Sequence, residues 1–114
     1  MKKTKTSNNY LEYVPTKKAL LRYSTDDNGI VTLEKENKGI VNAVAQKLLK
    51  KPKISYIHLD EMGSYIWLLI DGKASILQMG QLVKQKFGDD CEPLYERLSQ
   101  YIKILASNGF VDVD

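Results

Sequence analysis

Chemically reactive side chains are few in this sequence. It holds one histidine, His58, and one cysteine, Cys91. A single thiol cannot form an internal disulfide, and one thiol with one imidazole falls short of a structural metal site. Asp60 and Glu61 follow His58 closely, but two acids at this point fit the start of a helix better than a proton-transfer pair. The residues therefore predict neither catalysis nor a metal or other cofactor.

Charge is distributed unevenly along the 114 residues. Residues 1–53 hold twelve Lys or Arg and five Asp or Glu, a net charge of +7, whereas residues 54–114 carry −4. Solvated surface accounts for most such lysines, and attraction to an acidic partner is the alternative. No apolar run is long enough to cross a bilayer, and no apolar stretch follows the first lysines. We therefore expect a cytoplasmic protein without a signal peptide or membrane contact.

Residues 59–72, LDEMGSYIWLLIDG, contain the longest apolar run in the chain. Six consecutive apolar or aromatic residues point in all directions on a helix, which predicts a central helix covered on every side, with Trp67 buried. A buried strand is the rival interpretation for so short a run. The ends favour a helix, because Asp60 is a good N-cap and Asp71-Gly72 supplies a glycine where a helix would stop.

The remaining pattern predicts one α+β domain over residues 16–114, preceded by a flexible segment over residues 1–15. Asp, Asn and Gly over 26–29 predict a hairpin turn, and Ser75 with Gln78 predicts a capping box. In chain order the expected elements are strands over 19–24 and 30–36, a short helix over 40–49, a strand over 54–59, the central helix, a helix over 75–88, a third helix with Pro93 in its first turn that ends at Asn108, and an alternating tail over 110–114. The last two helices resemble a helix-turn-helix, with the tail as a wing.

The third helix has an apolar arc wider than packing in a small domain usually needs. Leu94, Leu98, Tyr101 and Leu105 form a core stripe; Tyr95, Ile102 and Ala106 widen it on one side, and Ile104 on the other. One interpretation is a helix covered by core and sheet. The other is a groove for an apolar peptide between this helix and the third strand, because an edge strand can accept an added strand.

Several of these motifs together resemble the PqqD-like family, relatives of the small protein D of pyrroloquinoline quinone biosynthesis. They are the run from Leu59 through Trp67 to Asp71-Gly72, the helix that ends at Phe87-Gly88, the segment from Glu92 to Leu98, and the stop at Asn108-Gly109-Phe110. The resemblance covers roughly residues 19–113. It implies a winged helix-turn-helix fold, with a three-stranded antiparallel sheet beside three helices, here with one extra short helix.

The resemblance also implies a function. Such domains hold the leader of a ribosomally made precursor peptide as an added strand and present it to a modifying enzyme, often a radical S-adenosylmethionine enzyme. With that function in view, we expect the third strand and one flank of the third helix to contact the peptide. The candidate peptide-binding residues are Ser55, Tyr56, Ile57, His58, Tyr95, Leu98 and Ile102.

Two other functions share this topology. A winged-helix DNA-binding regulator would need net positive charge on its third helix, but residues 89–108 hold four acids and only Arg97 and Lys103 as bases. Nucleic acid is therefore the less favoured partner. A homodimer through the same edge strand is the third alternative.

Overall fold

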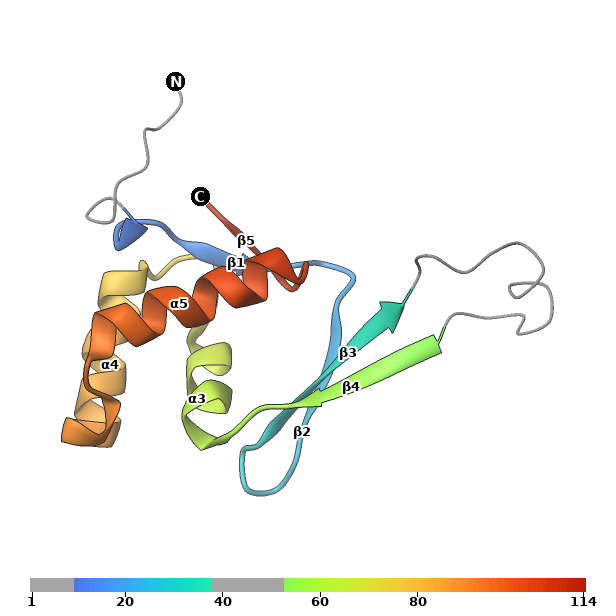
Figure 1. Cartoon of the computed structure of the whole chain (residues 1–114), viewed down its shortest axis with the longest axis horizontal. Coiled ribbons are helices and arrows are strands. Elements are labelled where there is room, and N and C mark those ends of the chain that lie inside the picture. The colour runs from blue at the N-terminus through green and yellow to red at the C-terminus, as the bar shows by residue number, and fades with distance from the viewer. Residues whose placement is uncertain (1–9, 38–52) are drawn as a thin grey trace.

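The computed structural model of the chain describes residues 10–37 and 53–114, and its helices lie together at one end of a sheet (Figure 1). The sheet is antiparallel, with its strands in the order β2-β3-β4. The elements are β1 (Pro15–Lys17), β2 (Arg22–Thr25), β3 (Val31–Asn37), β4 (Lys53–His58), α3 (Glu61–Leu69), α4 (Ile76–Phe87), the 3-10 turn η1 (Gly88–Cys91), α5 (Leu94–Ser107) and β5 (Val111–Val113).

The predicted α+β class, with a three-stranded antiparallel sheet and three helices, is confirmed. The winged-helix likeness stays a prediction, and the helix expected over 40–49 falls outside the described residues.

The β2–β3 hairpin forms around the predicted turn. The Asp26 carboxylate accepts hydrogen bonds from the backbone N–H groups of Asn28 at 2.8 Å and Ile30 at 2.9 Å. Gly29 has a φ of +82°, a conformation that glycine adopts without steric cost. Thr25 pairs with Val31 beside this turn, so the hairpin is confirmed, although its first strand begins at Arg22 rather than at residue 19.

α3 begins as predicted but is not covered on every side. The Asp60 side chain caps it by accepting a hydrogen bond from the N–H of Gly63 at 2.7 Å. Trp67 is fully buried, as predicted, whereas Leu68 is 45% exposed. The expectation of a helix buried on every side is therefore wrong, because the sheet and the other helices leave the side of α3 that carries Leu68 in solvent.

The helix also stops earlier than expected. It ends at Leu69, and Asp71 belongs to the loop that follows. There its carboxylate accepts hydrogen bonds from the N–H groups of Lys73 at 2.8 Å and Ala74 at 2.9 Å, which lower the pKa of Asp71. The Asp71-Gly72 pair thus shapes the turn into α4, with Gly72 at a φ of +77°.

α4 and α5 follow the predicted pattern closely. The capping box between Ser75 and Gln78 is present, and α5 ends at Ser107 with the expected Asn108 as its C-cap. Pro93 lies one residue before α5 rather than in its first turn, because η1 occupies the connection. None of the helices in the described part of the chain is long and apolar enough to cross a membrane.

Residues far apart in the sequence meet where β1 pairs with β5. Pro15 lies opposite Val113 in an antiparallel two-stranded sheet, a partner that the sequence pattern did not identify. Just before β1, the carbonyl groups of Leu11 and Tyr13 accept hydrogen bonds from Leu77 and Ile76, both at 2.9 Å. Residues 10–15 therefore lie against the helices. The domain boundary at residue 16 stays a prediction, and residues 1–9 lie outside the described part.

One buried hydroxyl joins α3 to the sheet. Ser64 is 1% exposed, and its Oγ accepts a hydrogen bond from the N–H of Val31 at 2.8 Å. In Ser64→Ala the Val31 N–H would lose this buried acceptor, so we expect the free energy of unfolding to fall by about 1–3 kcal/mol in chemical denaturation. Ser107→Ala removes an exposed hydroxyl on α5 and is the control, with an expected change within about 0.5 kcal/mol. Equal effects of the two changes would contradict this role for Ser64.

Candidate functional site

β4 lies at an edge of the sheet, as predicted, so one side of its backbone faces away from β3. The N–H of Leu59 donates to the carbonyl of Val31, and Ile57 lies opposite Leu33. In an antiparallel ladder, alternate residues of a strand bond to the same neighbour. Ser55 and Ile57 therefore bond toward β3. The N–H and C=O groups of Ile54, Tyr56 and His58 point away from β3, to an edge that no other described strand covers.

The register also decides which side chains of β4 face the helices. Ile57 lies opposite Leu33, whose side chain is fully buried, so Ser55 and Ile57 are on the helix side of the sheet. Tyr56 and His58 are on the opposite face. Tyr56 is 59% exposed, and a hydrogen bond of 2.8 Å joins His58 Nδ1 to Thr32 Oγ1.

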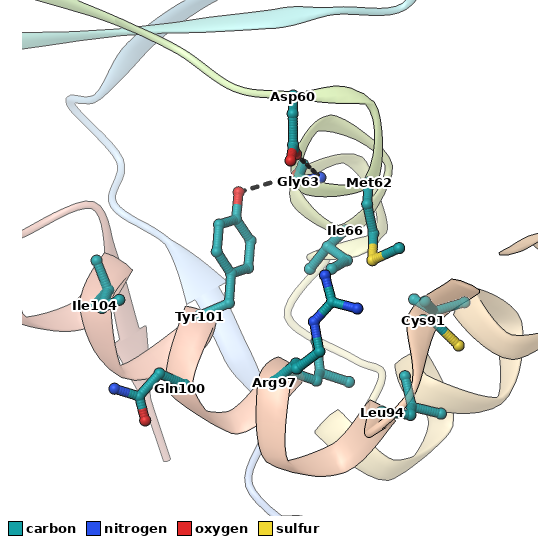
Figure 2. A pocket seen from close by; sticks show the side chains of 12 residues that line it. Asp60, Met62, Gly63, Ile66, Cys91, Leu94, Arg97, Gln100, Tyr101 and Ile104 are labelled. Carbon is teal, nitrogen blue, oxygen red and sulfur yellow. Dashed lines mark hydrogen bonds between the residues drawn. The ribbon is translucent and has the colours of Figure 1, made fainter. Parts of the chain in front are cut away.

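A pocket of about 340 Å³ opens between the start of α3 and one face of α5 (Figure 2). It begins two residues beyond the end of β4, because Asp60 forms part of its wall. Its size lies at the lower end of the range for small-ligand pockets. Most of the lining is apolar, contributed by Met62, Ile66, Val83, Cys91, Leu94, Leu98 and Ile104, with Asp60, Gly63, Arg97, Gln100 and Tyr101 completing it.

Hydrogen bonds fix the polar wall of this pocket. The Tyr101 hydroxyl donates to the carbonyl of Gly63 at 2.9 Å, as Figure 2 shows. Burial, and then the negative charge of Asp60, raise the pKa of Tyr101 well above its ordinary value, so its hydroxyl stays protonated and keeps this bond. A Cβ at Gly63 would lie 2.9 Å from Asp60 Oδ1 and 3.1 Å from Tyr101 Oη. Gly63 thus permits close approach of α3 and α5.

Comparison with known families identifies the chain. The family described as Coenzyme PQQ synthesis protein D (PqqD) matches residues 31–111, which run from β3 into β5. The chain belongs to the PqqD family. This family is associated with PQQ biosynthesis and with binding of ribosomally made precursor peptides, and its members are accessory proteins without catalytic activity. No curated protein and no solved structure matched the chain significantly.

The α5 residues predicted to contact peptide in this PqqD family member lie largely inside the protein. Leu98 is 2% exposed at the base of the pocket, and Ile102 is fully buried. The ring of Tyr95 packs against Gly80 of α4 so closely that a Cβ there would collide with it. The structure brings Leu98 to the pocket beyond the end of β4, whereas Tyr95 faces α4.

The accessible face of α5 lies on the flank that the sequence analysis did not choose. Arg97, Gln100, Tyr101 and Ile104 line the pocket at helical spacing. Ile104 is 50% exposed, and its position on the second flank of the apolar arc was the available signal. Single exposed apolar residues are ordinary on protein surfaces, so Ile104 is of interest only because it lines an apolar pocket.

Several charged side chains on and around α5 form ion pairs, hydrogen bonds or cation–π contacts with other residues of the protein. Lys84 pairs with Glu92 at 2.7 Å and Asp89 at 3.3 Å, and this pairing raises the pKa of Lys84 and lowers that of Glu92. Arg97 Nη1 donates to the carbonyl of Asp90 at 3.0 Å. The Lys103 ammonium lies 4.9 Å above the centre of the Tyr10 ring. Both cations of the 89–108 segment thus contact groups of the domain.

Proposed function

We propose that this PqqD family member is a non-catalytic adaptor for a ribosomally made precursor peptide. The leader of that peptide pairs with the open edge of β4 as a fourth strand. The protein then presents the rest of the precursor to a modifying enzyme of the radical S-adenosylmethionine class, in the cytoplasm, on a winged-helix scaffold. The observation that carries the proposal is an open strand edge that leads directly into an apolar pocket.

The edge supports binding through the peptide backbone. Ile54, Tyr56 and His58 together direct three N–H and three C=O groups outward, enough to pair with a peptide segment of about five residues. Main-chain hydrogen bonds give affinity and register with little dependence on sequence. A short strand alone would therefore bind many peptides.

The pocket supports selection among such peptides. A peptide that runs along β4 and past His58 reaches the pocket wall at Asp60 within about 7 Å, the length of two residues of strand. There an apolar side chain of the peptide would leave water and contact Met62 and Ile104. We therefore assign sequence preference to this pocket, with Ile57 lining the sheet side of the path.

A proline at the centre of the edge tests the proposal. Tyr56→Pro removes the N–H that points outward at the middle of β4 and leaves the ladder to β3 intact, because Tyr56 does not bond toward β3. The probe is a synthetic leader taken from a short precursor-like reading frame sought beside this protein's gene. We expect its binding to weaken by at least tenfold, about 1.4 kcal/mol. Calorimetric titration measures this affinity.

Tyr56→Ala is the matched control, because it removes the exposed ring but keeps the N–H. It should bind the same leader within about threefold of the wild type, roughly 0.7 kcal/mol. Thermal melts of both variants check that the fold is retained. Normal binding by Tyr56→Pro, or equal losses in both variants, would contradict pairing at this edge.

A further inference from the structure

We propose that Arg97 of α5 selects leaders that carry an acidic residue close to the apolar side chain that enters the pocket. The inference rests on the proposed function and adds a second requirement for the peptide that is bound. The group recognised is the carboxylate of an Asp or Glu side chain, which lies farther from β4 than the apolar residue does.

The guanidinium group of Arg97 is a cation in a mostly apolar wall. Arg97 lines the pocket together with Leu94, Leu98 and Cys91, and Figure 2 shows its side chain reaching from α5 toward α3. Its Nη1 donates to the carbonyl of Asp90 at 3.0 Å, and no carboxylate among the described residues forms an ion pair with it. A guanidinium has five N–H donors, so most of them are available to a ligand.

A carboxylate is the peptide group that fits such a cation best. Guanidinium and carboxylate can form two parallel hydrogen bonds, which are stronger than bonds between neutral groups. Before it is modified, a ribosomally made peptide carries carboxylates as its anions at neutral pH. A peptide that covers the pocket would also exclude water from this pair and so strengthen the attraction.

Acidic residues of the protein itself leave this cation available. Asp89 and Glu92 both pair with Lys84, at 3.3 Å and 2.7 Å. Of the acids in the described part of the chain, Asp60 alone lines the pocket. Its carboxylate accepts the N–H of Gly63 at 2.7 Å, and the positive end of α3 offsets part of its charge.

The two charged side chains of the pocket lie toward different ends of it. Asp60 directly follows β4 and lies beside Tyr101 (Figure 2). Arg97 precedes Tyr101 by four residues, about 6 Å along the helix, toward the end of α5 that lies farther from the sheet (Figure 1). A peptide that leaves β4 therefore passes Asp60, which repels acids, before it reaches Arg97. Because 6 Å is about two residues of extended chain, the acidic residue should lie about two positions beyond the apolar one.

Removing the charge on each side of the proposed pair tests it. The probe is the same synthetic leader with an amidated C-terminus, together with versions in which each Glu or Asp is changed singly to Gln or Asn. We expect one such change to weaken binding to the wild type by at least about fivefold, or 1 kcal/mol, in calorimetric titration. The loss should shrink in about 0.5 M NaCl, because salt screens the pair. Arg97→Gln should bind the acidic and the amide leader within about twofold of each other.

Lys103→Gln is the matched control. Lys103 is the other base of α5, but it lies outside the pocket lining and contacts the ring of Tyr10, so this variant should keep the preference. If Arg97 acted only by holding Asp90, Arg97→Gln would weaken both leaders equally and the preference would survive, which would overturn the inference. Equal binding of all leader versions by the wild type would overturn it without any variant, as would a bound leader that has no acidic residue.

The outcome is separable from that of the proposed function. Loss of leader binding in Tyr56→Pro, combined with no preference for an acidic leader, would remove the role of Arg97 and leave pairing at β4 standing. Normal binding by Tyr56→Pro, combined with a preference that depends on Arg97, would overturn the pairing and support the contact in the pocket.

Discussion

Trp67→Ala is expected to lower the free energy of unfolding by about 3–5 kcal/mol, the usual cost of truncating a fully buried tryptophan. The Trp67 ring meets the edge of Tyr23 at 5.4 Å between centroids, and the Lys17 ammonium lies 5.2 Å from its centroid. One side chain therefore joins α3 to β1 and β2. Denaturant unfolding followed by circular dichroism measures the loss.

Two further substitutions control this result. Leu68→Ala changes the next residue, which is 45% exposed, and should cost less than about 1.5 kcal/mol. Trp67→Phe should cost less than Trp67→Ala, because the buried Nε1–H has no hydrogen-bond partner among the described residues and none is lost. If Trp67→Ala costs no more than Leu68→Ala, Trp67 does not connect these elements.

The second large effect is expected at Ile102. This side chain is fully buried on α5, so Ile102→Asp places an unpaired carboxylate in the core. We expect destabilisation of about 4 kcal/mol or more, enough to unfold many small domains, together with loss of the cooperative thermal transition. A melt that matches the wild type would show that Ile102 is accessible.

Ile104→Asp is the matched comparison for Ile102→Asp. It lies two residues away on the same helix but is 50% exposed at the pocket. It should therefore keep a thermal midpoint near that of the wild type, while binding of the leader weakens by about tenfold or more, or 1.4 kcal/mol. Together the two variants separate damage to the fold from damage to the binding surface.

Local chemistry explains which elements could be predicted from the sequence. Asp60 and the Ser75–Gln78 pair act on backbone groups within three residues of themselves, so their roles follow from sequence alone. The hairpin turn at Asp26 is equally local. The strand expected over 54–59 is present as β4, where the adjacent Tyr56 and Ile57 lie on opposite faces of the sheet.

Contacts between distant residues explain what could not be predicted. α5 is apolar on both flanks, and projection on a helical wheel cannot tell which flank α4 covers. Gly80 decides it, because the absence of a side chain there lets the Tyr95 ring pack against α4. The flank with Ile104 is left open to solvent, so the candidate site on α5 differs from the one expected.

The pairing of β1 with β5 also determines when the fold can close during translation. Nearly the whole described chain separates Pro15 from Val113, so β1 gains its strand partner only after the end of β5 has left the ribosome. Closing so long a loop costs more entropy than forming the β2–β3 hairpin. β1 and β5 therefore dock late, and a local opening of this pair would free β1. Each such opening would carry Lys17 away from the indole of Trp67 and admit water to the one tryptophan of the chain.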